Sequence, residues 1–254
     1  MILTQFDQEN TAVLNPCNFV SKVEGMPRVA VTCYSCITFD RMLEGLDAKV
    51  VSHMGSANGV IPVYVADYKG KEIALFMIGV GAPMSVGSLE EIYEMGVEKV
   101  IVFGTCGVLD GNISDCSIII PNYAIRDEGT SYHYMPASDE IEVNEKYIDT
   151  FTDMLDEMNI SYTVGKTWTT DAIYRETKNK VEMRKKQGCI CVDMECSADA
   201  AVAKFRGKDL VQFFYATDNL DSEEYDARSL SNDAKVEEKN KIAIVALELA
   251  LRIM

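Results

Sequence analysis

Three short segments of this sequence carry side chains that could do chemistry, and each follows or interrupts an apolar run. The run "CICVDM" contains Asp193 and is followed by Glu195, while "DLVQFFYAT" leads into Asp218. In the third segment, "VIVFGTCGVL", two glycines bracket Thr105 and Cys106. Carboxylates, a hydroxyl and backbone amides are the groups with which a protein binds a polar small molecule.

The segment Asp193-Met194-Glu195 lies between a predicted buried strand and a predicted helix. A carboxylate there can accept two hydrogen bonds from vicinal hydroxyls of a sugar, and a methionine offers an adaptable apolar face to the sugar ring. Alternatively, Glu195 is only a first-turn acid that the helix dipole favours. The residues alone leave both interpretations open.

Asp218 comes directly after a buried run, in "YATDNLD". An aspartate in such a position is often a turn-former or a helix cap. It could instead be a partly buried acid that protonates a leaving group, and Arg228 is the first cation downstream that could tune it.

The segment Gly104–Gly107 also has two interpretations, and we expect the strand to end on it. Glycines allow a tight turn with close packing, or they let backbone N–H groups and the Thr105 hydroxyl seat an anion. A longer polar stretch, "AIRDEGTSYHYMP", contains Tyr132, His133 and Tyr134. These side chains could stack on a flat ring, or pack within the loop or on a partner subunit.

Alternating strand and helix patterns must position these groups. Continuous apolar runs indicate strands buried on both faces, and longer helical periods separate them. We therefore predict one α/β domain with a central mixed sheet between helices, in which ligands bind beyond the carboxyl ends of strands. The strands are expected at Arg28–Cys33, on both sides of Lys69-Gly70, at 99–104, Cys116–Pro121, Tyr162–Trp168, Cys189–Met194 and Asp209–Thr217. Helices are expected at Thr38–Gly45, from a capping Ser85 to Met95, within Asn144–Met158, before Cys189, at Ala198–Phe205 and at Asp233–Ile253.

The composition excludes several classes of protein. With 254 residues, 48% of them apolar, the chain can bury a deep core. Its 40 acidic residues outnumber 24 lysines and arginines, and the net charge of −16 repels nucleic acid and anionic lipid. No apolar stretch approaches the ~20 residues of a membrane span, and the first residues lack the pattern of a secretory signal. We expect a cytoplasmic protein with no nucleic-acid or membrane partner.

Eight cysteines and two histidines offer little for disulfide or metal chemistry. Most cysteines lie in apolar runs, as small core residues do, and nothing indicates secretion. Cys33 and Cys36 form a C-x-x-C pair, a spacing found in redox motifs, which we interpret as core and loop. His53 and His133 lie far from any cysteine pair, so we expect no metal site.

Taken in this order, the motifs resemble the nucleoside phosphorylase and nucleosidase superfamily, which contains purine nucleoside phosphorylases, uridine phosphorylases and methylthioadenosine nucleosidases. The similar segments are "YKGKEIALFMIGVGAP", "GVEKVIVFGTCGVL", "IRDEGTSYHY", "VDMECSA" and "YATDNL", which together span roughly Arg28 to the C-terminus. The family signature G-[ST]-x-G corresponds to Gly104–Gly107, and [ED]-M-E corresponds to Asp193-Met194-Glu195. The resemblance implies a single domain over residues 1–254, a three-layer α/β/α fold with a central mixed, partly barrel-like sheet and an N-terminal extension at residues 1–27.

The resemblance also implies roles for individual residues. Glu195 would bind the 2′ and 3′ hydroxyls of ribose, with Met194 against the sugar, and Thr105 would contact phosphate or its water substitute. Asp218 would protonate N7 of a purine, with Arg228 as its partner. The residues implied to bind substrate are Glu195, Met194, Asp193, Thr105, Gly104, Cys106, Gly107, Thr170, Tyr174 and His133. No metal or organic cofactor is implied, and phosphate is a possible cosubstrate.

The sequence departs from the phosphate-using members in its cations. Those members usually carry G-D-P-x-R and an arginine before G-[ST]-x-G, where this chain has "TCYSC" and Val102. Arg41 and Arg126 are candidate substitutes, although nothing in their spacing requires it. The turn where nucleosidases keep a glutamate base shows Thr38 and Asp40 instead. Uridine-specific members read the base with Gln-x-Arg, which "AIYRETKNK" lacks, and this favours a purine.

Three functions follow from the resemblance and its departures. The first is a purine-preferring nucleoside phosphorylase, a pentosyltransferase that cleaves the N-glycosidic bond with phosphate to give free base and ribose 1-phosphate. The second is a phosphate-independent nucleosidase or a uridine phosphorylase, and the third is a non-catalytic nucleoside-binding relative. The family works as dimers and hexamers, which implies a homodimer or homohexamer whose site borrows residues from a neighbour, with His133 and its loop as candidates.

Overall fold

The computed structural model describes residues 2–57, 59–230 and 234–254, and within them the chain forms a mixed sheet surrounded by helices. The strands are β1 (Val29–Cys33), β2 (Ala48–Ser56), β3 (Gly59–Tyr68), β4 (Lys71–Met77), β5 (Lys99–Val108), β6 (Ile118–Asp127), β7 (Glu140–Glu142), β8 (Tyr162–Thr170), β9 (Cys189–Asp193) and β10 (Asp209–Asn219). The helices are α1 (Cys36–Glu44), α2 (Ala82–Glu94), α3 (Ile148–Glu157), α4 (Lys178–Lys186), α5 (Cys196–Arg206) and α6 (Val236–Ile253). Short 3-10 helices are η1 (Ile2–Thr4), η2 (Pro16–Asn18), η3 (Thr130–His133) and η4 (Ile173–Arg175).

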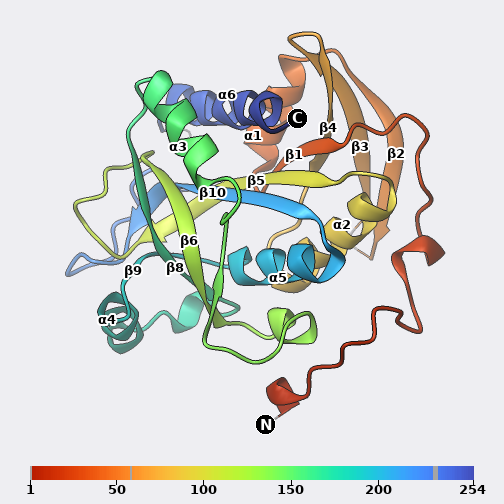
Figure 1. The fold of residues 1–254 in the computed structure, drawn as a ribbon. Coiled ribbons are helices and arrows are strands. Elements are labelled where there is room, and N and C mark those ends of the chain that lie inside the picture. Colours follow the sequence, from red (N-terminus) through yellow and green to blue (C-terminus); the bar gives the residue numbers. More distant parts are fainter. Residues whose placement is uncertain (1, 58, 231–233) are drawn as a thin grey trace.

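Five of the strands close into a barrel (Figure 1). β5 pairs with β10 along one edge and with β9 on the other, while β10 pairs with β6, β6 with β8, and β8 with β9. From β5 the sheet also continues through β1, β4 and β3 to the edge strand β2, and β7 pairs with β6. Parallel and antiparallel pairs both occur, so the predicted mixed, partly barrel-like sheet is confirmed.

Helices cover both faces of this sheet (Figure 1). On one face α1, α3 and α6 pack on a core that includes Phe103, Phe151 and Phe213, all fully buried. On the other face α2 and α5 pack on a second core that includes Phe76 and Leu89. These two helical layers around one sheet confirm the predicted three-layer α/β/α arrangement.

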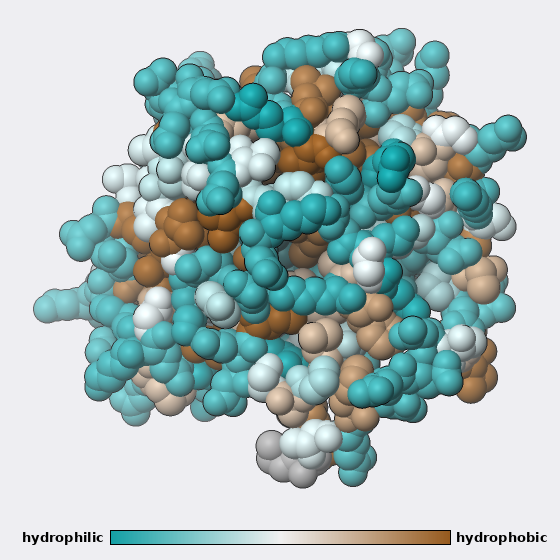
Figure 2. Space-filling model, viewed as in Figure 1, coloured by the Kyte–Doolittle hydropathy of each residue, from teal (hydrophilic) through white to brown (hydrophobic). Residues whose placement is uncertain are grey.

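The face of the molecule seen in Figure 2 is largely hydrophilic. Only small hydrophobic patches lie between the hydrophilic residues. Among the described residues, every helix is too short or too polar to cross a membrane.

The structure differs from the prediction at three of its elements. Ser85 was expected to cap a helix, but α2 begins at Ala82 after Gly81, whose φ of 93° suits glycine, and Ser85 lies buried in the first turn. The edge strand β2 was not predicted, because most of its side chains are exposed and it lacks an apolar pattern. The last helix was expected from Asp233, which lies outside the described residues, and α6 begins at Val236.

The largest correction concerns Gly104–Gly107. The strand does not end there in a bend, because β5 continues to Val108 and stays paired with β10. Close packing explains the two glycines. A Cβ on Gly104 would lie 2.7 Å from Cδ2 of Tyr34, and a Cβ on Gly107 would lie 2.5 Å from Cδ1 of Leu220.

Candidate active site

A gap in the pairing of β5 marks the candidate site. Along the edge opposite β10, β1 pairs with β5 as far as Phe103, and β9 pairs with it only from Gly107 onward. The intervening segment Gly104–Cys106 therefore has a strand neighbour on one edge only. Tyr34 follows the end of β1 and Glu195 follows the end of β9, so the two neighbouring strands end on either side of the gap.

Glu195 is buried and joins the starts of two helices. It is the N-cap residue of α5, and its Oε1 accepts a hydrogen bond at 2.6 Å from the backbone N–H of Gly81, the N-cap residue of α2. Burial raises the pKa of Glu195 well above its usual range, and the charge of Asp193 raises it further. Glu195 thus stands at a helix start, but its carboxylate reaches across to the other helix. Met194 beside it is half-buried.

Asp193 is held entirely by protein donors. Its Oδ1 accepts from the hydroxyls of Thr167 and Thr169, each at 2.9 Å. Its Oδ2 accepts from the backbone N–H groups of Glu195 at 2.8 Å and Cys196 at 2.6 Å. Burial nevertheless raises the pKa of Asp193 to about 6. Asp193 therefore fixes the turn that leads into Glu195, and both of its carboxylate oxygens already accept hydrogen bonds from the protein.

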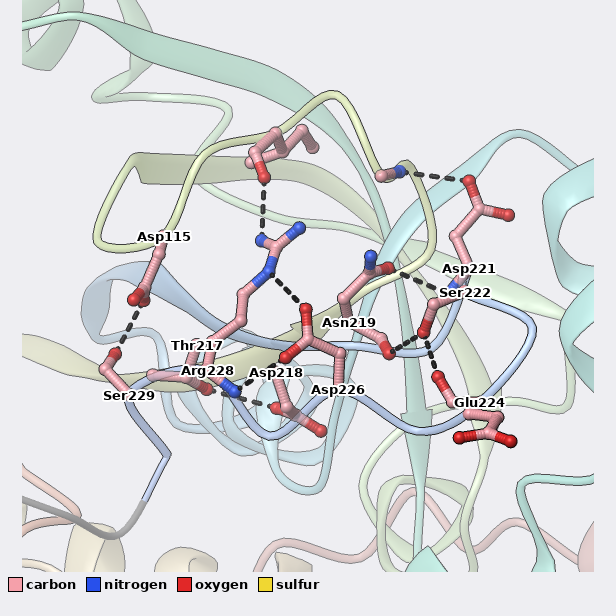
Figure 3. Close-up of polar contacts among 12 residues, drawn as sticks. Asp115, Thr217, Asp218, Asn219, Asp221, Ser222, Glu224, Asp226, Arg228 and Ser229 are labelled. Carbon is pink, nitrogen blue, oxygen red and sulfur yellow. Dashed lines mark hydrogen bonds and ion pairs between the residues drawn. The ribbon is translucent and has the colours of Figure 1, made fainter.

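Asp218 lies at the end of β10, beside the glycine strand. A Cβ on Gly107 would be 3.3 Å from its Oδ2, and the Thr217 hydroxyl is 3.1 Å from its Oδ1 (Figure 3). Asp218 is half-buried, so it is open to a ligand while it is fixed on a strand.

Two groups that the sequence analysis missed lie near Asp218. Glu176 follows η4, where burial and then the charge of Asp218 raise its pKa to about 7. Tyr225 lies near Asp218, and partial burial and the Asp218 charge raise the pKa of this tyrosine to about 12. Both residues come from polar loops without an apolar pattern, so only the fold brings them to the site.

Arg228 does not pair with Asp218 as the resemblance implied. Its Nε lies 3.6 Å from Oδ2 of Asp226, and its Nη1 donates to the carbonyl of Ile113 at 2.8 Å. Figure 3 shows the Arg228 guanidinium directed toward Asp226, while the carboxylate of Asp218 faces Thr217. Among the described residues no ion pair joins Arg228 to Asp218, because the loop after β10 turns this arginine toward the segment between β5 and β6.

A cavity of about 360 Å³ opens beside Thr105. Two cations line it, Arg41 from α1 and Lys239 from α6, and the Thr38 hydroxyl side chain lies in the same wall. Lys239 also donates to the Ser229 carbonyl at 2.8 Å. The described residues that line the cavity do not include the carboxylates of the preceding paragraphs. The other lining residues are Tyr34, Ser35, Cys36, Ile37, Met77, Tyr215, Leu230 and Val236.

Arg126, the other candidate for a phosphate cation, is engaged within its own loop. It is buried, and it donates to the Ser131 hydroxyl at 2.8 Å, the Pro136 carbonyl at 2.7 Å and the Ser138 hydroxyl at 2.8 Å. Its guanidinium also lies 4.2 Å from the centre of the Tyr132 ring. Within the single chain, Arg126 and Tyr132 therefore pack on their own loop, one of the three alternatives that the sequence left open.

The remaining predicted residues are spread around this centre. Tyr174 is 96% exposed, and His133 is exposed on η3, so in the single chain neither is enclosed in the site. Thr170 is buried, and Cys106 is buried in the core with its pKa raised by burial.

The cysteines are consistent with their interpretation as core and loop. All eight are free; Cys33 is buried in the core and Cys36 is exposed at the start of α1. No group of three or more metal-ligating side chains gathers within the described ranges.

Comparison with known proteins identifies relatives. A family profile described as "Phosphorylase superfamily" matches residues 29–251. A guanosine phosphorylase of Halorubrum lacusprofundi is 25% identical over 160 residues, which cover 61% of this chain and 65% of that protein, just under two thirds of its length. A DeoD-type purine nucleoside phosphorylase of Buchnera aphidicola is 27% identical over 190 residues, which cover 74% of this chain and 80% of the relative.

Two solved structures share the fold. The uridine phosphorylase of Vibrio fischeri has a TM-score of 0.78 at 21% identity, with 97% of this chain and 100% of that chain covered. The purine nucleoside phosphorylase of Toxoplasma gondii, solved with immucillin-H, has a TM-score of 0.77 at 19% identity, with 90% and 93% covered.

Proposed function

Because this chain belongs to the phosphorylase superfamily, we propose that it is a purine-preferring nucleoside phosphorylase, which cleaves the N-glycosidic bond with phosphate to give free base and ribose 1-phosphate. One observation carries the proposal: Arg41 and Lys239 line the cavity beside Thr105. The usual phosphate arginines are absent from the sequence, and these two cations offer replacements from α1 and α6.

Local charge is what a phosphate site in this chain requires. A net charge of −16 repels an anion at long range, so binding needs cations close to the phosphate. Hydrogen bonds from charged donors are roughly twice as strong as those between neutral groups. Arg41 and Lys239, with the exposed Thr105 hydroxyl between α1 and α6, supply such a set of donors.

Glu195 and Asp218 support the two remaining roles, which are sugar binding and proton transfer. In this mechanism Glu195 accepts hydrogen bonds from the ribose hydroxyls, and the sugar gains positive charge as the glycosidic bond lengthens. Phosphate attacks the sugar carbon, while Asp218 delivers a proton to the leaving base. Asp193 holds the turn that presents Glu195, through the four hydrogen bonds to its carboxylate.

Glu176 beside Asp218 supports a purine base. Burial and the charge of Asp218 raise the pKa of Glu176 to about 7, so Glu176 can offer a proton donor or an acceptor near neutral pH. A 6-oxopurine presents a matching acceptor at N7 and a matching donor at N1. The names of the Halorubrum and Buchnera relatives, which are guanosine and purine phosphorylases, also support a purine.

A panel of nucleosides assayed with and without phosphate or arsenate tests the proposal. We expect phosphate-dependent release of purine bases. Release of base without phosphate would instead indicate a nucleosidase, release from uridine alone a uridine phosphorylase, and binding without release a non-catalytic relative. Each of these three results would overturn the proposal.

The phosphate cations have their own test. Arg41→Met and Lys239→Met should each raise the KM for phosphate about tenfold or more, because a hydrogen bond to a charged group contributes ~1.5–3 kcal/mol. The KM for nucleoside should change much less. Arg252→Met is the matched control, since Arg252 is on α6 but pairs with Glu157 at the surface. Equal phosphate KM values in all variants would remove both cations from the site.

We also propose a single domain over residues 1–254, with residues 1–27 as an N-terminal extension, since the family match begins at residue 29. The proposed protein is a cytoplasmic homodimer or homohexamer whose partners are nucleoside and phosphate. The exposed positions of Tyr174 and His133 support a site completed by a neighbouring subunit. Sedimentation of the chain as a monomer at assay concentration would contradict the assembly.

A further inference from the structure

We propose that Tyr34 is a positioning residue that couples the anion cavity to Glu195, so that each substrate strengthens binding of the other. The inference rests on the proposed function, because it takes a phosphate and a ribose as the two ligands. Tyr34 lies in the turn between β1 and α1. It contacts both the strand beside the proposed phosphate cavity and the helix turns that hold Glu195.

The Tyr34 ring lies at the cavity in which phosphate would bind. It lines the cavity together with Thr105 and Arg41. It also lies so close to Gly104 that a Cβ there would be 2.7 Å from its Cδ2. The ring therefore contacts the strand segment that carries Thr105, and a shift of that segment must move the ring.

Around Glu195, where ribose would bind, four hydrogen bonds form a closed circuit. Gly81 donates its N–H to Glu195 Oε1 at 2.6 Å, and its carbonyl accepts from the backbone N–H of Ser85 at 3.0 Å. The Ser85 hydroxyl donates to Oδ1 of Asp199 at 2.7 Å. The backbone N–H of Asp199 closes the circuit by donating to the Glu195 carbonyl at 3.0 Å. The circuit joins the first turns of α2 and α5.

The Tyr34 hydroxyl connects the two sides. It donates to Oδ2 of Asp199 at 2.7 Å and lies 3.0 Å from the Ser85 hydroxyl oxygen. Ser85 and Asp199 are both completely buried. Hydrogen bonds in a buried network polarise one another and hold a single arrangement. One side chain therefore touches Gly104 with its ring and the Glu195 circuit with its hydroxyl.

Coupling follows from this connection. A phosphate on Thr105 and Arg41 orders the turn that carries Tyr34, and the Tyr34 hydroxyl fixes the helix turn that presents Glu195. The second ligand then meets a site that the first has already ordered, which is positive cooperativity. Such coupling is reciprocal and typically amounts to ~5–150-fold in affinity.

Binding of guanosine with and without saturating sulfate, an unreactive phosphate analogue, measures the coupling by calorimetry. In the wild-type chain we expect sulfate to tighten guanosine binding at least about fivefold. Tyr34→Phe keeps the ring on Gly104 and removes the hydroxyl, so sulfate should lose most of this effect. Tyr147→Phe is the matched control, because its hydroxyl also donates to a carboxylate, that of Asp209 at 2.5 Å, and Tyr147 does not line the cavity beside Thr105.

A second variant keeps the test decisive if Tyr34→Phe fails to fold. Ser85→Ala opens the circuit while Tyr34 stays in place, and it should also weaken the coupling. Sulfate without effect on the wild-type chain, or coupling of wild-type strength in both variants, would overturn the role of Tyr34. Failure of the proposed function is distinguishable in the nucleoside panel, where base would then be released without phosphate, released from uridine alone, or not released at all.

Discussion

The backbone N–H of Gly81 donates to the carboxylate of Glu195 across 2.6 Å, although 114 positions separate them in the sequence. Gly81 takes up a positive φ of 93° at the start of α2, and Glu195 precedes α5. Burial and the nearby charge of Asp193 both raise the pKa of Glu195, and the amide donor acts in the opposite direction. The contact fixes where this carboxylate can meet a ligand.

Replacement of that carboxylate should discriminate between sugars. Glu195→Gln should lower kcat/KM for a ribonucleoside by about 10–100-fold, because a hydrogen bond to a charged group contributes ~1.5–3 kcal/mol. A 2′-deoxyribonucleoside lacks one of the two hydroxyls and should lose less. The measurement compares inosine with 2′-deoxyinosine, with Glu94→Gln at the exposed end of α2 as control. Equal losses on both substrates would contradict the contact to the 2′ hydroxyl.

Asp218 is expected to act on the leaving base. Asp218→Asn keeps the size of the side chain but cannot deliver a proton, so turnover of purine nucleosides should fall by about 10²–10⁴-fold. Glu224→Gln, on the loop that follows β10, replaces an exposed acid and serves as control for the loss of one charge. Single-turnover release of base separates the chemical step from binding. Unchanged turnover in Asp218→Asn would remove this residue from the mechanism.

Much of the fold and part of the site could be predicted from local patterns. The strand positions were predictable because buried strands are continuous apolar runs. Glu195 and Asp218 could be chosen as candidate site residues because each directly follows such a run. The edge strand β2 was not, since its mostly exposed side chains carry no apolar pattern.

Groups brought together by tertiary packing were not predictable. Lys239 approaches Thr105 only because α6 packs on the face that carries α1. The contact between Ser85 and Asp199 depends on how α2 meets α5. Arg228 follows Asp218 in sequence, yet a loop turns it toward Asp226 and Ile113. Spacing along the chain carries no information about any of these contacts.

The pH dependence of activity should report on Glu176. Burial and the charge of Asp218 raise the pKa of Glu176 to about 7. As the pH rises through about 7, Glu176 loses its proton, so kcat/KM for a purine nucleoside should decline. Glu176→Gln cannot titrate and should show a lower kcat/KM without that decline. The profile is measured from pH 5.5 to 8.5, and a decline that persists in the variant would assign it to another group.

The stability of the fold should fall with rising pH because of Asp199. Burial raises the pKa of this carboxyl from 3.8 to about 7, although hydrogen bonds from Ser85 and Tyr34 oppose the shift. The folded chain therefore binds the proton more tightly than the unfolded chain, and the free energy of unfolding decreases between about pH 4 and pH 7. Asp199→Asn keeps an acceptor for one donor and removes the titration. The Tm should therefore drop less between pH 5 and pH 8 in the variant than in the wild type. The corresponding difference in the free energy of unfolding is on the order of a few kcal/mol.

Asp209 provides a control with the opposite sign. Its pKa is lowered, because hydrogen bonds from Lys146 and Tyr147 outweigh the effect of burial. This carboxylate stabilises the fold when it is ionised, so Asp209→Asn should lower the Tm more at pH 8 than below pH 3, where the stabilisation is lost as the pH falls through the lowered pKa. Thermal melts of both variants across this range separate the two effects. If the Tm of Asp199→Asn changed with pH as steeply as the wild-type Tm, the buried carboxyl would not take up a proton on folding.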